Sequence, residues 1–162
     1  MNERPDRRME RGRLTREKLI AEGARLFALK GFEGVSTREL AVAGGVNAAA
    51  ISFHFGGKAG LYAAVVEDVA AHFAELYRES LVPARELPEG ADREQAAEAL
   101  REMVTRLART VLGTERSLWM SLLIQRELLA PSEAFESIYS RIILPVIEAY
   151  ARAVALAGGL PP

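Results

Sequence analysis

The sequence contains no cysteine and only two histidines. The absence of cysteine excludes disulfide bonds, thiol catalysis and thiolate metal sites. The two histidines, His54 and His72, lie eighteen residues apart, and no cluster of candidate ligands surrounds either. No serine, histidine and acid combination and no phosphate-binding loop has a spacing that would assemble an active site. We therefore expect no metal, no cofactor and no enzyme.

The sequence also lacks a long hydrophobic run and an apolar N-terminal signal segment. No apolar stretch approaches the roughly 20 residues that a membrane-spanning helix needs, and the N-terminus is charged. We therefore expect a cytoplasmic protein without a membrane partner. Apolar residues still make up 49% of the 162 residues, which is enough for a sizeable core.

The net charge of -1 conceals a basic first third and an acidic remainder. Residues 1–60 carry 11 Lys and Arg against 7 Asp and Glu, whereas the remaining residues carry 10 against 15. A basic end on an acidic body is typical of a nucleic-acid contact at that end. A solvated surface produces such a modest imbalance about as often.

Apolar residues recur at helical spacing along the chain, and no alternating strand pattern is present, so the sequence predicts an all-α fold. Helix caps and breakers divide this pattern into seven helices. We expect a first helix from about Thr15 to Lys30, a second with a capping box of Ser36 and Glu39, and a third over residues 48–54 capped by Asn47. A fourth helix should cover about 58–81, followed by a loop at Pro83, Pro88 and Gly90. The last three are a fifth helix from Asp92 to Gly113, a sixth from Thr114 to Leu129, and a seventh capped by Ser132 and kinked at Pro145.

The most informative stretch is residues 36–62, which predict two very short helices around the turn Gly44-Gly45 and a lysine that opens a long helix. A helix of about two turns is marginal alone in water. Such a pair of helices is typical of a helix-turn-helix, whose second helix enters the major groove of DNA. Ala48, Ala49 and Ala50 permit the close approach that a groove about 12 Å wide requires.

Within this predicted recognition helix, Ile51 and Phe55 should anchor the helix on the core. Asn47, Ala48, Ser52 and Phe53 should then project outward. Asn47 is suited to capping the helix, to a phosphate contact or to a base edge, and we favour capping. Phe53 could contact a thymine methyl group or simply pack against protein.

Residues 15–66 resemble the DNA-binding head of the TetR family of regulators. The resemblance rests on the runs 27–32, 35–41, 43–46 and 53–58, followed by Leu61 and Tyr62. It implies an N-terminal three-helix helix-turn-helix head on a helical ligand-binding and dimerisation domain. The corresponding boundaries are 1–14 for a mobile basic arm, 15–57 for the head and 58–162 for the helical domain.

The resemblance implies that Thr37, His54 and Lys58 contact DNA phosphates, and it places Arg38 in the same DNA-binding set. The alternative for His54 is a surface position packed against Phe27 or Phe32. Ser52 departs from the family, which usually has an aromatic residue there. The arginines of residues 4–13 could enter an adjacent minor groove or remain a solvated tail.

Residues 124–131 and 143–145 resemble the ligand domain of the CecR-like branch of this family. An effector bound there is expected to move the fourth helix and to change the separation of the two heads. Candidate lining residues are His72, Phe73, Tyr77, Met103, Trp119, Met120, Leu123, Phe135 and Tyr139. For each of them ordinary core packing is the alternative. Arg126 and Glu127 are adjacent, and we expect them to form separate ion pairs.

The resemblance therefore implies a ligand-responsive transcriptional repressor, a homodimer that binds a palindromic double-stranded operator and leaves it when an unknown small molecule binds. The alternative is a helical scaffold protein whose head no longer binds DNA. The family closes its dimer with two further long helices. Residues 157–162 predict a helix stop and a loop instead, so we expect the sequence to be incomplete at this end.

Overall fold

The structure is a computed structural model that describes residues 4–158. Every regular element in this range is helical, which confirms the all-α prediction. The elements are α1 (Arg4–Lys30), α2 (Thr37–Gly44), α3 (Ala48–Phe55), α4 (Lys58–Ser80), α5 (Val82–Arg85), α6 (Arg93–Leu112), α7 (Glu115–Leu129), α8 (Phe135–Ile138), the π-helical turn η1 (Tyr139–Ile143) and α9 (Leu144–Gly158). Residues 1–3 of the predicted arm and 159–162 of the predicted C-terminal loop lie outside the described residues.

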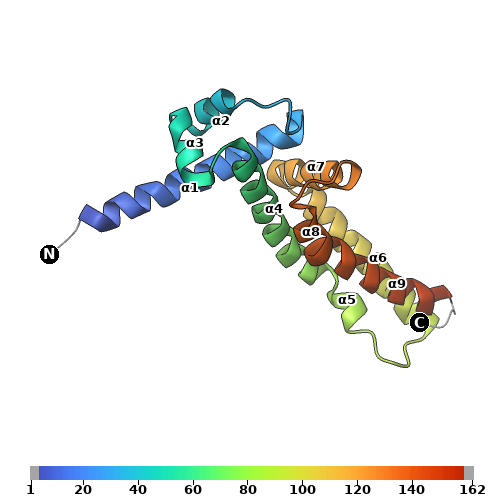
Figure 1. The fold of residues 1–162 in the computed structure, drawn as a ribbon. Helices are drawn as coiled ribbons and strands as arrows, with labels where there is room; N and C mark the ends of the chain where they lie inside the picture. Colours follow the sequence, from blue (N-terminus) through green and yellow to red (C-terminus); the bar gives the residue numbers. More distant parts are fainter. Residues whose placement is uncertain (1–3, 159–162) are drawn as a thin grey trace.

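Figure 1 shows a small head and a helical body that are linked by α4. In the head, α2 lies against α1, and α3 packs on α2 and on the start of α4. In the body, α6 packs along α9, while α7 reaches back to contact the C-terminal part of α1. None of the helices within residues 4–158 combines the length and the apolarity that crossing a membrane requires.

The prediction that the first helix starts near Thr15 is wrong, because α1 begins at Arg4 and is continuous to Lys30. In Figure 1 the first of the added turns project away from the other helices. Arg13 supports them with ion pairs to Glu10 at 2.6 Å and to Glu17 at 2.5 Å, at helical spacings of three and four residues. Exposed pairs at these spacings support a helix only modestly, and Arg, Met and Glu are good helix formers.

The caps of the short helices are set by local side chains, largely as predicted. The Ser36 hydroxyl accepts a hydrogen bond from the Glu39 amide at 3.1 Å, and Asn47 accepts one from the Ala50 amide at 2.9 Å. The reciprocal half of the predicted capping box is absent, because the Glu39 carboxylate pairs with Lys30 instead. A cation offers a carboxylate a stronger partner than a backbone amide does. Asp92 begins α6 with a complete capping box.

The predicted seventh helix is divided, and Ser132 does not cap it. Ala134 precedes α8 without a side-chain cap, while Ser132 bonds to Glu127. The predicted kink takes the form of the π-turn η1, immediately before Pro145 in the first turn of α9. Proline donates no amide hydrogen bond and crowds the carbonyl four residues earlier, and one wide turn accommodates both effects. The predicted loop after α4 contains the single turn α5.

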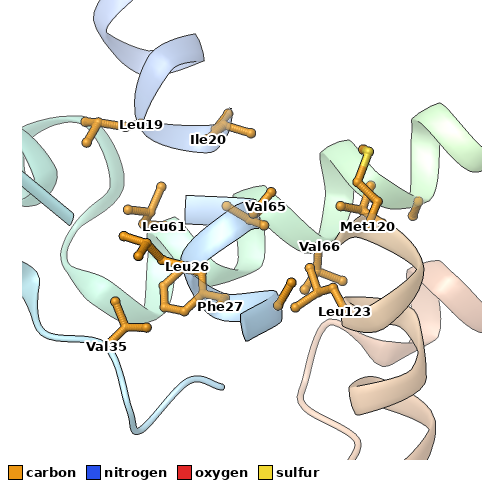
Figure 2. Close-up of a cluster of buried hydrophobic side chains, with 14 of the residues drawn as sticks. Leu19, Ile20, Leu26, Phe27, Val35, Leu61, Val65, Val66, Met120 and Leu123 are labelled. Atoms are coloured by element: carbon orange, nitrogen blue, oxygen red, sulfur yellow. The ribbon is translucent and has the colours of Figure 1, made fainter. Parts of the chain in front are cut away.

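One hydrophobic cluster crosses the predicted boundary between head and body. It contains Phe27 from α1, Ile51 from α3, Val65 from α4 and Leu123 from α7, all fully buried. Figure 2 shows Phe27 of the head among Leu61 and Val65 of α4 and Leu123 of α7. A second cluster joins α5, α6 and α9 in the lower body. The head therefore shares its core with α4 and α7.

Candidate nucleic-acid interface

A glycine turn sets the angle between α2 and α3. Gly45 has φ +64°, and its amide donates to the Val42 carbonyl at 3.0 Å while the Val46 amide donates to Ala41 at 2.9 Å. The left-handed backbone is accessible to glycine without steric cost. A Cβ atom at Gly44 would lie 2.7 Å from Leu19 Cδ2, so this position also needs glycine for the close packing of α2 on α1.

The α3 helix presents a small-residue face to solvent. Ile51 is fully buried and anchors the helix, and the half-buried Phe55 packs against the same cluster, as predicted. Ala48, Ala49 and Ser52 are exposed, and Phe53 is 83% exposed. Asn47 is exposed too, but its side-chain oxygen is used as the N-cap. The outward direction of these residues is therefore confirmed, while their contact with DNA stays a prediction.

His54 packs in a different place from the one expected. Its ring lies edge-on to Phe53 at 5.0 Å between centroids and 6.2 Å from the Phe55 ring. A Cβ atom on Gly12 would lie 3.8 Å from His54 Cε1, so the histidine is against the added part of α1. The alternative packing on Phe27 or Phe32 is therefore wrong. The reason is that α1 extends far enough toward its N-terminus to cover this side of α3.

Lys58 lies in the first turn of α4, where its ammonium sits over an aromatic ring. Its Nζ atom is 4.2 Å from the centroid of the Phe32 ring, a cation–π contact. Gly57 precedes the helix with φ +127° and provides no side-chain cap. The first amides of α4 therefore have no side-chain acceptor, and such a helix start favours an anion.

Two further predicted residues lie on α2, and two basic residues of α1 border the head. Thr37 is half-buried in the first turn of α2, and Arg38 is exposed beside it. The Arg16 guanidinium lies 5.3 Å from the centroid of the Phe55 ring, and Lys18 Nζ approaches Gly45. The sequence-based interpretation missed Arg16 and Lys18, because it did not use the contact of α1 with α3. The side chains of Arg4 and Arg8 lie outside the described ones.

The predicted effector residues do not line one cavity. Phe73, Met120 and Leu123 are fully buried in the first cluster, whereas Met103 is buried in the second. Phe135 and Tyr139 pair with each other at 6.1 Å between ring centroids, and Tyr139 is exposed. Half-buried His72 packs edge-on to Phe73, and Trp119 lies below the Arg25 guanidinium at 5.9 Å. For the four buried residues, Phe73, Met103, Met120 and Leu123, the alternative of ordinary core packing is correct.

Tyr77 differs from the others because it lines a cavity of about 450 Å³ between α4, η1 and α9. The same cavity is bordered by Arg78 and Arg141, and by Leu81 and Ile142. This mixture of an aromatic ring, aliphatic groups and guanidinium groups suits a small amphipathic molecule. The effector-site prediction stays a prediction, with Tyr77 as its best-placed member.

The burial of tyrosines should make stability fall at high pH. Burial raises the pKa of Tyr77 to about 12, and burial followed by hydrogen bonding to Glu127 raises the pKa of Tyr62. The folded state therefore favours the neutral phenol. The contribution of this group to the free energy of unfolding is fully present below the ordinary pKa of about 10, and it is lost as the pH rises through about 12. Tyr77→Phe should flatten this loss in denaturant titrations. An equally steep loss in Tyr77→Phe would contradict the assignment.

Arg126 and Glu127 do not form the ion pairs that the sequence predicts. The Arg126 guanidinium donates to the Ala28 carbonyl at 2.8 Å and to the Leu29 carbonyl at 3.2 Å, so it caps the C-terminus of α1 from α7. Glu127 is only 1% exposed and accepts a hydrogen bond from the Tyr62 hydroxyl on α4. Adjacent residues of α7 thus bind α1 of the head and α4. No local sequence pattern signals partners this far along the chain.

Comparison with known proteins gives two matching families. The family described as bacterial regulatory proteins, tetR family, matches residues 19–65. The C-terminal domain of the HTH-type transcriptional dual regulator CecR matches residues 96–162. The first match covers α2, α3 and their turn, and the second begins within α6.

Curated relatives are regulators. The chain is 30% identical over 148 residues to the HTH-type transcriptional dual regulator CecR of Shigella flexneri. This alignment covers 90% of this chain and 65% of the relative. It is 42% identical over 67 residues to the probable HTH-type transcriptional regulator YttP of Bacillus subtilis (strain 168), covering 41% of this chain and 30% of YttP. The chain thus spans less than two thirds of the length of either relative.

Solved structures share the fold. The hemolysin II transcriptional regulator HlyIIR has a TM-score of 0.67 at 22% identity, with 91% of this chain and 75% of that chain covered. PfmR of Thermus thermophilus, a TetR family transcriptional regulator, has a TM-score of 0.61 at 23% identity, covering 89% and 72%. At these identities the likeness concerns the arrangement of helices. The family matches across the head and the body, with the relative that is 30% identical over most of this chain, show that the chain belongs to the TetR family of regulators.

Proposed function

We propose that this chain is a transcriptional repressor that binds operator DNA through its head and is released when a small molecule binds its helical body. The observation that carries the proposal is the exposed, small-residue face of α3, held outward by the buried Ile51 and by the Asn47 cap. A short helix with an alanine-lined outer face fits the major groove of duplex DNA. The curated relatives, which are named as transcriptional regulators, support the same function.

Base contacts in this proposal come from Ala48, Ser52 and Phe53. The Asn47 side-chain oxygen already accepts a hydrogen bond from the Ala50 amide, which leaves the asparagine less free to read a base. Ser52 can donate to a base edge, and the exposed Phe53 ring can contact a thymine methyl group. This face holds few polar groups, so part of the specificity should come from the shape of the DNA.

Phosphate contacts in this proposal come from residues around α3. Lys58 and the uncapped amides of α4 follow the C-terminal end of α3, and His54 lies in the last turn of α3. Thr37 and the exposed Arg38 begin α2 on the other side. Contacts to phosphates on both sides would hold α3 in register with the groove without reading sequence.

Release by an effector requires two heads that dock together. We propose a homodimer on a palindromic operator, because half-sites of such operators lie one helical turn, ~34 Å, or a multiple apart. The cavity beside Tyr77 touches α4, which leads directly to the head. A molecule bound there would favour another placement of α4 and weaken docking by a coupling free energy of about 1–3 kcal/mol.

Removing the Lys58 charge should weaken DNA binding at all sequences alike. We choose Lys58→Met because an unbranched apolar side chain can still pack on Phe32. Removal of one phosphate contact should reduce the slope of log K against log salt by about 0.9. Fluorescence anisotropy with the DNA upstream of its own gene, at several salt concentrations, measures both quantities.

Arg109→Met is the matched control, since it removes one exposed positive charge from α6, which belongs to the helical body. It should leave the salt slope unchanged. Equal slopes for the two variants would contradict the phosphate contact of Lys58. Absence of binding to any promoter fragment, with the dimer intact, would favour the scaffold alternative over the repressor.

A further inference from the structure

A cleft lies where the head meets the body. It measures about 680 Å³ and is bordered by the end of α1, the first turns of α4 and the segment that joins α7 to α8. Figure 1 shows the end of α1 beside α7 at this junction. Its volume falls within the range of about 300–1,000 Å³ that is usual for small-molecule sites.

The cleft contains an uncompensated buried carboxylate. Glu127 is only 1% exposed, yet its oxygens are bonded by neutral donors alone, namely the Tyr62 hydroxyl, the Ser132 amide at 3.1 Å and the Ser132 hydroxyl at 2.9 Å. No salt bridge involves Glu127 within residues 4–158. Burying a carboxylate without a cation is costly, and hydrogen bonds offset only part of the cost.

The surroundings of Glu127 also favour positive charge. The C-terminal ends of α1 and α7 border the cleft at Gly31 and Ala130, and helix C-termini carry a partial negative charge. Glu33 and Glu133 add carboxylates at the rim. The two lining cations are already engaged elsewhere: Lys30 pairs with Glu39, and Arg126 bonds to the carbonyls that end α1.

The remaining wall is apolar and aromatic. The Phe32 and Tyr62 rings pack edge-on at 5.2 Å between centroids, and both border the cleft. Small side chains at Ala59, Ala63 and Ala134 leave the space open. Aromatic faces attract organic cations, and the attraction grows when the cation is partly removed from water.

We propose that this junction cleft is a binding site for a small organic cation with an aromatic or aliphatic part, whose charge is balanced by Glu127. The site is separate from the cavity beside Tyr77, in which we place the effector of the proposed function. Because it touches α1, α4 and α7 together, a molecule in the cleft would contact the head and the body at once.

Isothermal titration calorimetry of the chain without DNA tests the site independently of any operator. The probes are benzyltrimethylammonium and the neutral benzyl alcohol, which share the benzyl group and differ in charge. We expect the cation to bind at least about 10-fold more tightly, as one well-paired charge provides. Equal affinities, or no heat from the cation, would overturn the proposal. Since no DNA is present, failure of the repressor proposal would not produce either result.

Variants locate the bound probe. Glu127→Gln should weaken benzyltrimethylammonium binding by about 10-fold or more, whereas Glu115→Gln, at an exposed position of the same helix, should not change it. Unchanged affinity in Glu127→Gln would overturn the role of the carboxylate.

A second variant keeps the test decisive if Glu127→Gln does not fold. Ala63→Phe fills the cleft from an exposed position on α4 and should abolish binding of the cation. Ala151→Phe adds the same ring at an exposed position of α9, outside the cleft and outside the cavity beside Tyr77, and should leave binding intact. Binding that survives in Ala63→Phe would place the probe elsewhere and overturn the site.

Discussion

Ala48→Glu should abolish DNA binding and leave the protein folded. Ala48 is exposed in the first turn of α3, which contains no acidic residue. A carboxylate there would meet the negative charge of the DNA groove, and like charges brought together cost several kcal/mol, roughly 100-fold or more in affinity. The same carboxylate is favourable for the helix, by about 0.3–1 kcal/mol, because it lies at the positive end of the helix dipole.

The two effects of Ala48→Glu have opposite signs, which separates impaired DNA binding from impaired folding. Anisotropy with operator DNA measures the first, and denaturant titration measures the second. Thr105→Glu adds the same charge to an exposed position of α6 and should change neither by much. If Ala48→Glu binds DNA as tightly as the unmodified chain, the outer face of α3 does not enter the groove.

Phe27→Ala should destabilise the head and the body together. Phe27 is fully buried, lies 5.0 Å from the Tyr62 ring centroid and packs in the cluster that includes residues of α4 and α7. Truncation of a buried phenylalanine costs about 3–5 kcal/mol, since it removes apolar contacts and leaves a cavity. Unfolding should remain a single transition, because both parts use the same core.

Leu14→Ala is the control for this prediction. Leu14 lies on the same helix but is 51% exposed, so its truncation should change the free energy of unfolding by no more than about 0.5 kcal/mol. Far-ultraviolet circular dichroism during urea titration compares the two variants. Amide exchange at Ile51 should accelerate in Phe27→Ala. Exchange that accelerates only in the body would contradict the shared core.

The parts of the fold that depend on a few neighbouring residues could be predicted from the sequence. Asn47 caps α3 through an amide three residues away, and Asp92 begins α6 in the same manner. Gly45 supplies the left-handed turn between α2 and α3. In each case the physical cause lies within one helical turn, so the residue types and their spacing were sufficient.

Contacts between distant segments could not be predicted in this way. Arg126 bonds to carbonyls of α1, and Glu127 to Tyr62 of α4, which lie 65 or more positions earlier in the chain. Charge alone suggested ion pairs for both residues. The early start of α1 was also missed, because a dense run of arginines resembles a disordered tail unless the pairing of Arg13 with its helical neighbours is considered.

The burial and exposure of the α3 residues were predicted better than the surroundings of the effector candidates. Apolar and small residues alternate around α3 in a pattern that separates the buried Ile51 from the exposed Ala48 and Phe53. The effector candidates were chosen mainly as large apolar or aromatic residues, a property that core residues share. Only the packed structure distinguishes Tyr77, which borders open space, from Phe73, which does not.

The contact between Arg25 and Trp119 gives this protein a built-in optical reporter. Trp119 is the sequence's one tryptophan, and it lies on α7 beneath a guanidinium from α1, where the two parts of the molecule touch. Its emission wavelength and its quenching by iodide should therefore follow any relative displacement of those two helices. Movements of these helices during the proposed release from DNA would thus be measurable without attaching a dye.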